Sequence, residues 1–142
     1  VRATRLVLPH MRKQKWGRII NISSSGVRQP VPGLTLSNSI RMAVLGWAKT
    51  LANQVAGDNI LVNTVCPGFT RTDRVTQILE QQSAATGKRT DEIAAAIAAQ
   101  SPLQRIGEPE EIANLAVFLG SEAASFITGT AIQVDGGSVQ VP

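Results

Sequence analysis

The first quarter of the chain shows helical spacing of apolar residues followed by a strand-like run. Residues 1–13 predict an amphipathic helix because apolar side chains recur at helical spacing among basic ones. The expected buried face of this helix consists of Ala3, Leu6, Val7 and Met11. Residues 18–23 form a short β-branched run after Gly17, which is typical of a strand buried in a parallel sheet.

The same alternation of helix and strand continues to the end of the chain. Strong helical periodicity follows the first loop, weaker periodicity occupies the middle, and Pro109 suits the first position of a further helix. The expected helices lie at residues 39–55, 73–82, 90–100 and from Pro109 onward, and the expected further strands at residues 60–65 and 131–134. Helices that alternate with about three strands predict an α/β fold with a parallel β-sheet flanked by helices.

Composition narrows the class of protein. The 142 residues, 43% of them hydrophobic, suit one compact domain. No apolar run approaches the roughly 18 to 20 residues of a membrane span. Cys66 is the only cysteine and His10 the only histidine, so no internal disulfide and no Cys/His metal site are expected. We therefore expect a cytoplasmic protein without a metal, in which Cys66 is a packed thiol rather than a reactive one.

Basic residues are concentrated in the first part of the chain. The net charge is +4, and the first acidic residue is Asp58. Such a segment could contact nucleic acid, but a solvated helix face is the preferred interpretation, and a nucleic-acid partner is the weakest of three functional hypotheses.

Short polar residues and glycines follow all three expected strands. The segments are Ser-Ser-Ser-Gly at 23–26, Cys-Pro-Gly-Phe-Thr-Arg-Thr at 66–72 and Asp-Gly-Gly at 135–137. In an open parallel sheet, ligands bind outside the carboxyl ends of the strands. These segments are therefore candidates for one ligand site, although the same residue types also occur in ordinary turns.

Four ordered segments resemble the short-chain dehydrogenase/reductase family over nearly the whole chain. They are RIINISSSG, AVLGWAKTLA, ILVNTVCPGFTRTD and RIGEPEEIANLAVFLGSEAASFITGTAIQVDGG. The resemblance implies a partial, doubly wound Rossmann fold. It also implies an oxidoreductase that uses NAD or NADP and transfers a hydride between nicotinamide and a small carbonyl or secondary alcohol substrate.

The resemblance assigns roles to residues at the strand ends. Ser24 matches the family's catalytic serine, whose hydroxyl binds the substrate oxygen. The family's cofactor-binding loop matches Pro67, Gly68, Phe69 and Thr72, so that backbone next to Phe69 would meet the nicotinamide carboxamide and Thr72 would help to bind the cofactor.

The chain departs from the family at the YxxxK motif, where Ser37 and Arg41 take the tyrosine and lysine positions. Ser37 follows Ser24 by thirteen residues, the family's spacing, and the chain contains no tyrosine. A serine hydroxyl is a far poorer acid than a phenol, whose pKa is about 10. Ser37 is therefore either a weakened catalytic residue or only the N-terminal cap of the long helix. Arg41 either supports catalysis and binds a ribose or phosphate, or is a surface arginine.

The family's glycine-rich cofactor motif has no counterpart among these residues. We therefore expect residues 1–142 to be the C-terminal part of a single NAD(P)-binding domain whose glycine-rich half is absent, as in a fragment, a mis-assigned start or a truncated gene. The strand at 18–23 should then have an unpaired edge, beside exposed apolar helix faces.

Besides the oxidoreductase, we consider a catalytically impaired relative. Such a pseudoenzyme or fragment would bind a nucleotide or only form oligomers. The resemblance implies a homo-oligomer that pairs through the helices at residues 1–13 and 39–55.

Overall fold

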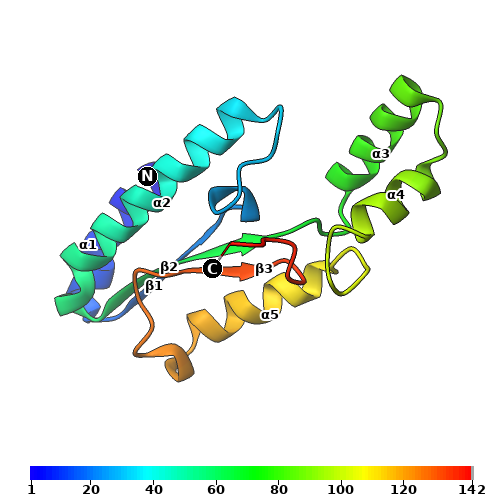
Figure 1. The fold of residues 1–142 in the computed structure, drawn as a ribbon. Coiled ribbons are helices and arrows are strands. Elements are labelled where there is room, and N and C mark those ends of the chain that lie inside the picture. The colour runs from blue at the N-terminus through cyan, green and yellow to red at the C-terminus, as the bar shows by residue number, and fades with distance from the viewer. Residues whose placement is uncertain (142) are drawn as a thin grey trace.

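A computed structural model, which describes residues 1–141, shows a parallel three-stranded sheet between layers of helices (Figure 1). The strands β1 (Gly17–Ile22), β2 (Ile60–Pro67) and β3 (Ala131–Val134) lie side by side in that order. Helices α1 (Arg2–Gln14) and α2 (Thr35–Val55) cover one face, and α5 (Pro109–Gly120) covers the other. The predicted α/β class, the three strands and their parallel direction are confirmed.

Helices α3 (Asp73–Thr86) and α4 (Thr90–Ala98) form an arm that projects from the sheet (Figure 1). They confirm the two weakly marked helices, with shifted ends. The arm has its own small apolar cluster, formed by Val75, Ile93, Ile97 and Ile106. Three short 3-10 helices complete the fold: η1 (Ser25–Val27), η2 (Ala56–Asp58) and η3 (Glu122–Ala124).

The main core lies on both faces of β2. Ile60 and Val62 are fully buried against Val55 of α2 on one face. Val65 packs against Leu119 of α5 on the other. Burial of each large aliphatic side chain contributes about 1.5–3 kcal/mol. This two-sided burial explains why β2 consists of an almost unbroken apolar run.

The predicted buried face of α1 is correct at Met11 but wrong at Ala3, Leu6 and Val7, which are exposed. Leu6 is 81% exposed, whereas Leu8 and Met11 pack against the core. The connection to β1 sets the rotation of the helix, because Trp16 N–H donates to the Met11 carbonyl and the Met11 side chain lies against Gly17. A Cβ at Gly17 would lie 2.7 Å from Met11 Sδ, so a larger residue here would require the Met11 side chain to shift.

A buried amide joins β2 to the segment that leads into β3. Asn63 is 2% exposed, and its Nδ2 donates to the Ile127 carbonyl at 2.7 Å while its Oδ1 accepts from Thr130 N–H at 3.3 Å. These bonds satisfy both ends of the amide and hold the start of β3 against β2. Sequence periodicity did not indicate this role.

The edge of β1 is unpaired within residues 1–141. β1 pairs only with β2 there, and Ile22 at its carboxyl end is 56% exposed. The expected open edge is therefore observed.

Candidate active site

The guanidinium of Arg41 joins α2 to the carboxyl end of β1. Arg41 Nε donates to Ser37 Oγ at 3.2 Å, and Arg41 Nη1 donates to the Ser23 carbonyl at 2.7 Å. Ser37 and Arg41 are one helical turn apart and face the same side of α2. Both side chains are half-buried. The structure therefore brings together Ser37 and Arg41, the two residues that the sequence resemblance aligns with YxxxK.

The interpretation of Ser37 as a helix cap is wrong. α2 begins at Thr35, its N-cap is Leu34 with no side-chain hydrogen bond, and Ser37 lies within the first turn. Asn38 instead joins this turn to the preceding loop, because its Nδ2 donates to the Val31 carbonyl at 2.9 Å and its Oδ1 accepts from Val31 N–H at 3.4 Å. An asparagine just after a Pro/Gly loop was the sequence signal for this contact.

Ser24 lies between two hollows at the carboxyl ends of the strands. Ser23, before it, lines a pocket of about 420 Å³ together with Ser37 and Arg41. Ser25, after it, lines a larger cleft of about 890 Å³ together with Phe69. Ser24 caps η1, and its Oγ accepts from Gly26 N–H at 3.1 Å. The same oxygen retains its own proton to donate to a ligand.

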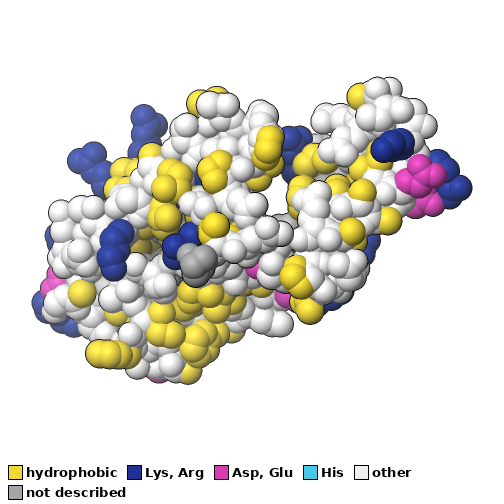
Figure 2. Space-filling view, viewed as in Figure 1, with side chains coloured by type: hydrophobic (Ala, Val, Ile, Leu, Met, Phe, Trp, Pro, Cys, Tyr) yellow, Lys and Arg dark blue, Asp and Glu magenta, His cyan; other side chains and the backbone are white. Residues whose placement is uncertain are grey.

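The cleft lies between the arm and the strand ends, where Figure 2 shows the surface hollowed. Although it is the larger hollow, Ser24, Ser37 and Arg41 do not line it. Ser37 and Arg41 line the smaller pocket, and Ser24 lines neither hollow. The larger cleft is adjacent through the Ser23–Ser25 segment.

The segment from Pro67 to Phe69 is held tightly against β3. Pro67 ends β2 and pairs with Val134, and Gly68 N–H donates to the Val134 carbonyl at 3.0 Å. A Cβ at Gly68 would lie 2.8 Å from the Cβ of Asp135, so only glycine permits this close approach. The Phe69 carbonyl accepts from Gly107 N–H at 3.0 Å. Phe69 N–H has no hydrogen-bond acceptor among residues 1–141.

Thr72 lies apart from this cluster. It is the N-cap of α3, without a side-chain cap, and its Oγ1 donates to the Thr70 carbonyl at 3.2 Å. In the part of the chain that the structure describes, no hydrogen bond joins it to Ser24, Ser37 or Arg41. Thr72 therefore connects the Pro67–Phe69 segment to the arm through the backbone.

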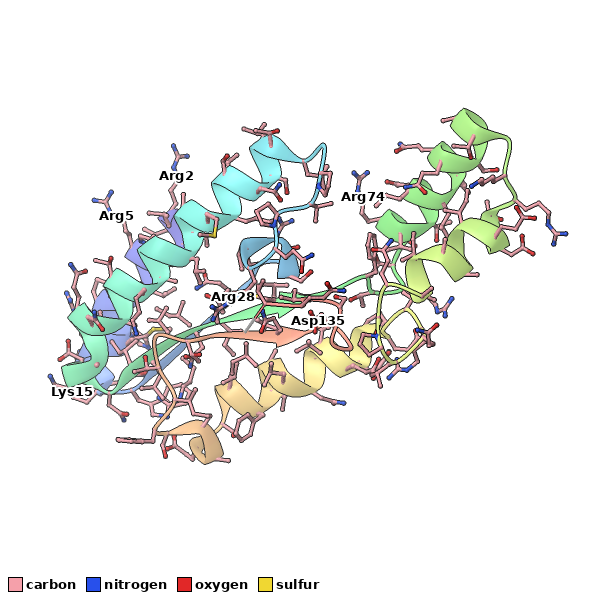
Figure 3. All side chains as sticks on the ribbon, viewed as in Figure 1. Arg2, Arg5, Lys15, Arg28, Arg74 and Asp135 are labelled. Carbon is pink, nitrogen blue, oxygen red and sulfur yellow. The ribbon has the colours of Figure 1, made fainter. Side chains whose placement is uncertain are left out.

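Asp135 organises the chain that follows β3 (Figure 3). Its Oδ1 accepts from Gly137 N–H at 3.0 Å, and its Oδ2 accepts from Val139 N–H at 2.9 Å and from Ser138 Oγ at 3.2 Å. Gly136 and Gly137 have φ values of 62° and 81°, which favour glycine. Sequence analysis identified Asp-Gly-Gly as a polar segment at a strand end but not the carboxylate's three partners.

The pKa values of Cys66 and Glu111 are shifted. Burial raises the pKa of the Cys66 thiol, which is 1% exposed, as expected for a packed cysteine. Hydrogen bonds from Arg105 and from the Glu108 backbone lower the pKa of Glu111 to about 2. Arg105 meets Glu111 through two bonds, at 2.7 Å and 2.6 Å. Glu111 is thus held ionised at the edge of the cleft.

None of the helices in residues 1–141 is long and apolar enough to cross a membrane. Over the same residues, no three His, Cys, Asp or Glu side chains are grouped so that they could hold a metal ion.

Comparison with known proteins identifies the family. The sequence model of a family described as enoyl-(acyl carrier protein) reductase matches residues 1–139. The 3-oxoacyl-acyl-carrier-protein reductase FabG of Aquifex aeolicus is 42% identical, over 92% of this chain and 48% of its own length. The NADPH-dependent reductase BacG of Bacillus subtilis is 37% identical, over 92% of this chain and 50% of its own length.

Solved structures show the same relationship. YwfH, described as an NADPH-dependent reductase involved in bacilysin biosynthesis, matches with a TM-score of 0.92 at 36% identity, over 99% of this chain and 54% of that one. L-sorbose reductase from Gluconobacter frateurii, solved with NADPH and L-sorbose, matches with a TM-score of 0.92 at 33% identity. The match covers 98% of this chain and 53% of that one. The chain belongs to the short-chain dehydrogenase/reductase family, and it spans about half the length of the relatives it matches.

Proposed function

We propose that the complete protein containing this chain is an NAD(P)-dependent oxidoreductase acting on a small carbonyl or secondary alcohol. Residues 1–142 would form the C-terminal part of its single NAD(P)-binding domain. The observation that carries the proposal is the bond from Arg41 to Ser37 beside the end of β1, because it orders both residues at the family's tyrosine and lysine positions.

The donors left at the strand ends suit a nicotinamide nucleotide. Phe69 N–H is available for the carboxamide oxygen, and Pro67 and Gly68 hold that backbone rigidly against β3. Arg41 uses Nε and Nη1 within the chain, so Nη2 remains for a ribose hydroxyl. Thr72, which is exposed, would add a hydroxyl contact. The bound nucleotide would supply or accept the hydride, and these residues would orient it.

Ser24 and Ser37 would bind the substrate oxygen. Each hydroxyl already accepts an N–H, from Gly26 and from Arg41 respectively, so each is oriented to donate its own proton. Two such donors stabilise the negative charge that develops on a carbonyl oxygen during reduction. Water would supply the proton that the product alcohol gains, because a serine hydroxyl is a far poorer acid than a phenol.

A matched assay tests the proposal. The full-length protein should oxidise NADPH or NADH in the presence of a panel of ketones, and the alcohol should appear in equal amount. Arg41→Ala should abolish most of this turnover, whereas Arg2→Ala, on the solvent side of α1 (Figure 3), should not. Cofactor binding without turnover on any ketone would instead favour the catalytically impaired relative.

We further propose that two copies pair through α1 and α2. Apolar side chains are exposed on both helices, including Leu6 at 81% and Leu36 at 73%. A cytoplasmic location remains an expectation from composition.

A further inference from the structure

The chain after β3 turns back along the strand ends and is fastened to the loop that follows Ser24 (Figure 1). Gln140 N–H donates to Gln29 Oε1 at 3.1 Å across 111 residues of sequence. We call this bond the tail clasp and residues 138–140 the tail. The clasp joins the last described segment to the turn that begins at η1.

Both sides of the clasp line the larger cleft. Gln29 and Ser25 line it from the η1 turn, and Ser138 and Val139 line it from the tail. The two segments thus form one continuous wall, next to the position of Ser24. The opposite wall comes from the arm, through residues such as Thr86 and Ile97.

Several contacts hold the turn at residues 135–137, whereas within residues 1–141 only the clasp bond holds the tail to Gln29. At this turn, Ser101 Oγ donates to the Gly136 carbonyl at 2.7 Å, and a Cβ at Gly137 would lie 3.2 Å from Pro102. Asp135 accepts three hydrogen bonds from the chain that follows it. The clasp is a single exposed bond, so one substitution can open it without removing the turn below.

We propose that the tail, held by the clasp on Gln29, is a specificity-determining wall that limits the size of the group a carbonyl substrate carries on the side of Ser24. The proposal rests on the proposed function for the class of ligand. A closed wall excludes a bulky substituent by steric contact, while a compact ketone needs only the space between the wall and the arm.

Two pairs of variants in the full-length protein test the wall. Gln140→Pro removes the donating N–H, and Gln140→Ala is its control because it keeps that N–H. Gln29→Ala removes the accepting oxygen, and Gln29→Glu is its control because it keeps an acceptor. The two pairs lie in different segments, so a folding defect in one leaves the other informative.

Dissociation constants are measured calorimetrically for a methyl ketone and its phenyl analogue, with turnover of NADPH followed separately. Opening the clasp should favour the phenyl ketone relative to the methyl ketone by about tenfold, the discrimination typical of one added group in a pocket. Both controls should keep the wild-type ratio. Two results would contradict the proposed role of the tail. One is an equal ratio of the two dissociation constants in the wild-type protein and all four variants, and the other is no binding of either ketone. Ketones that bind with the expected ratios but are never reduced overturn the proposed function alone.

Discussion

Arg41 donates a hydrogen bond to Ser37 from one helical turn away, and the same guanidinium donates to the Ser23 carbonyl at 2.7 Å. A planar guanidinium can make both bonds at once, and a lysine ammonium cannot reproduce that geometry. The two residues that depart from the family motif therefore form a pair that is ordered together.

Arg41→Lys should weaken nucleotide binding. Loss of a hydrogen bond to a charged group costs about 1.5–3 kcal/mol, which corresponds to about a tenfold or larger rise in the dissociation constant. Titration of the full-length protein with NADPH, followed by nucleotide fluorescence, measures the effect. Arg2→Lys serves as the control, since Arg2 points away from the sheet (Figure 3). If Arg41→Lys leaves the dissociation constant for NADPH unchanged, Arg41 does not contribute to cofactor binding.

Ser37→Ala should lower kcat by about 10²-fold if its hydroxyl stabilises the developing oxyanion. A serine hydroxyl does not ionise in the ordinary pH range, so Ser37 itself should add no pH dependence to the wild-type rate of reduction between about pH 6 and 9. Introducing Ser37→Tyr together with Arg41→Lys should add a pH-dependent limb. If the reduction rate of the wild-type protein already changes with pH over the same range as that of the double variant, this role of Ser37 is contradicted.

The strands were predictable because burial on both faces leaves a strong local signal. β2 is an apolar run that begins at Ile60 as predicted, and it extends two residues beyond the predicted end, to Pro67. The face of α1 was not predictable, because the contact of Met11 with Gly17 sets the rotation of the helix. Helical periodicity fixes which residues share a face but not which face meets the sheet.

The candidate site residues were named from sequence, but the contacts between them were not. Position along the chain indicated Ser24, Ser37 and Arg41, through the family spacing. The bond from Arg41 to the Ser23 carbonyl arises only when α2 crosses back over the end of β1. Backbone acceptors carry no sequence signature, so this contact required the structure.

Gly68→Ala should destabilise the protein. The new Cβ would lie 2.8 Å from Asp135 Cβ and 2.9 Å from its Cα, so the backbone must shift. Such overpacking costs about 1–3 kcal/mol, measured by urea unfolding of the full-length protein. Gly46→Ala is the matched control, because a Cβ there meets nothing within 4 Å and alanine favours the helix by up to about 1 kcal/mol. Equal unfolding midpoints for the two variants would refute the close approach at Gly68.

Acid should weaken the fold partly through Glu111. Its pKa in the folded protein is about 2, below the ordinary value of 4.5, because Arg105 and the Glu108 N–H stabilise the carboxylate. A lowered folded-state pKa contributes stability above the unfolded-state value, and that contribution is lost as pH falls from about 4.5 toward about 2. The fall in Tm over this range should be smaller for Glu111→Gln than for the wild-type protein. If Tm falls equally with pH in the wild-type protein and in Glu111→Gln, the ion pair between Arg105 and Glu111 makes no such contribution.

Hydride transfer itself is the most direct test of the account. The full-length protein is incubated with NADPH that carries deuterium at the transferable C4 position and with a ketone that it binds, and the product is examined by mass spectrometry. The account predicts an alcohol with one deuterium on the former carbonyl carbon, formed by the wild-type protein and much more slowly by Ser37→Ala. Nucleotide and ketone bound together, with no deuterium in any product, would contradict it.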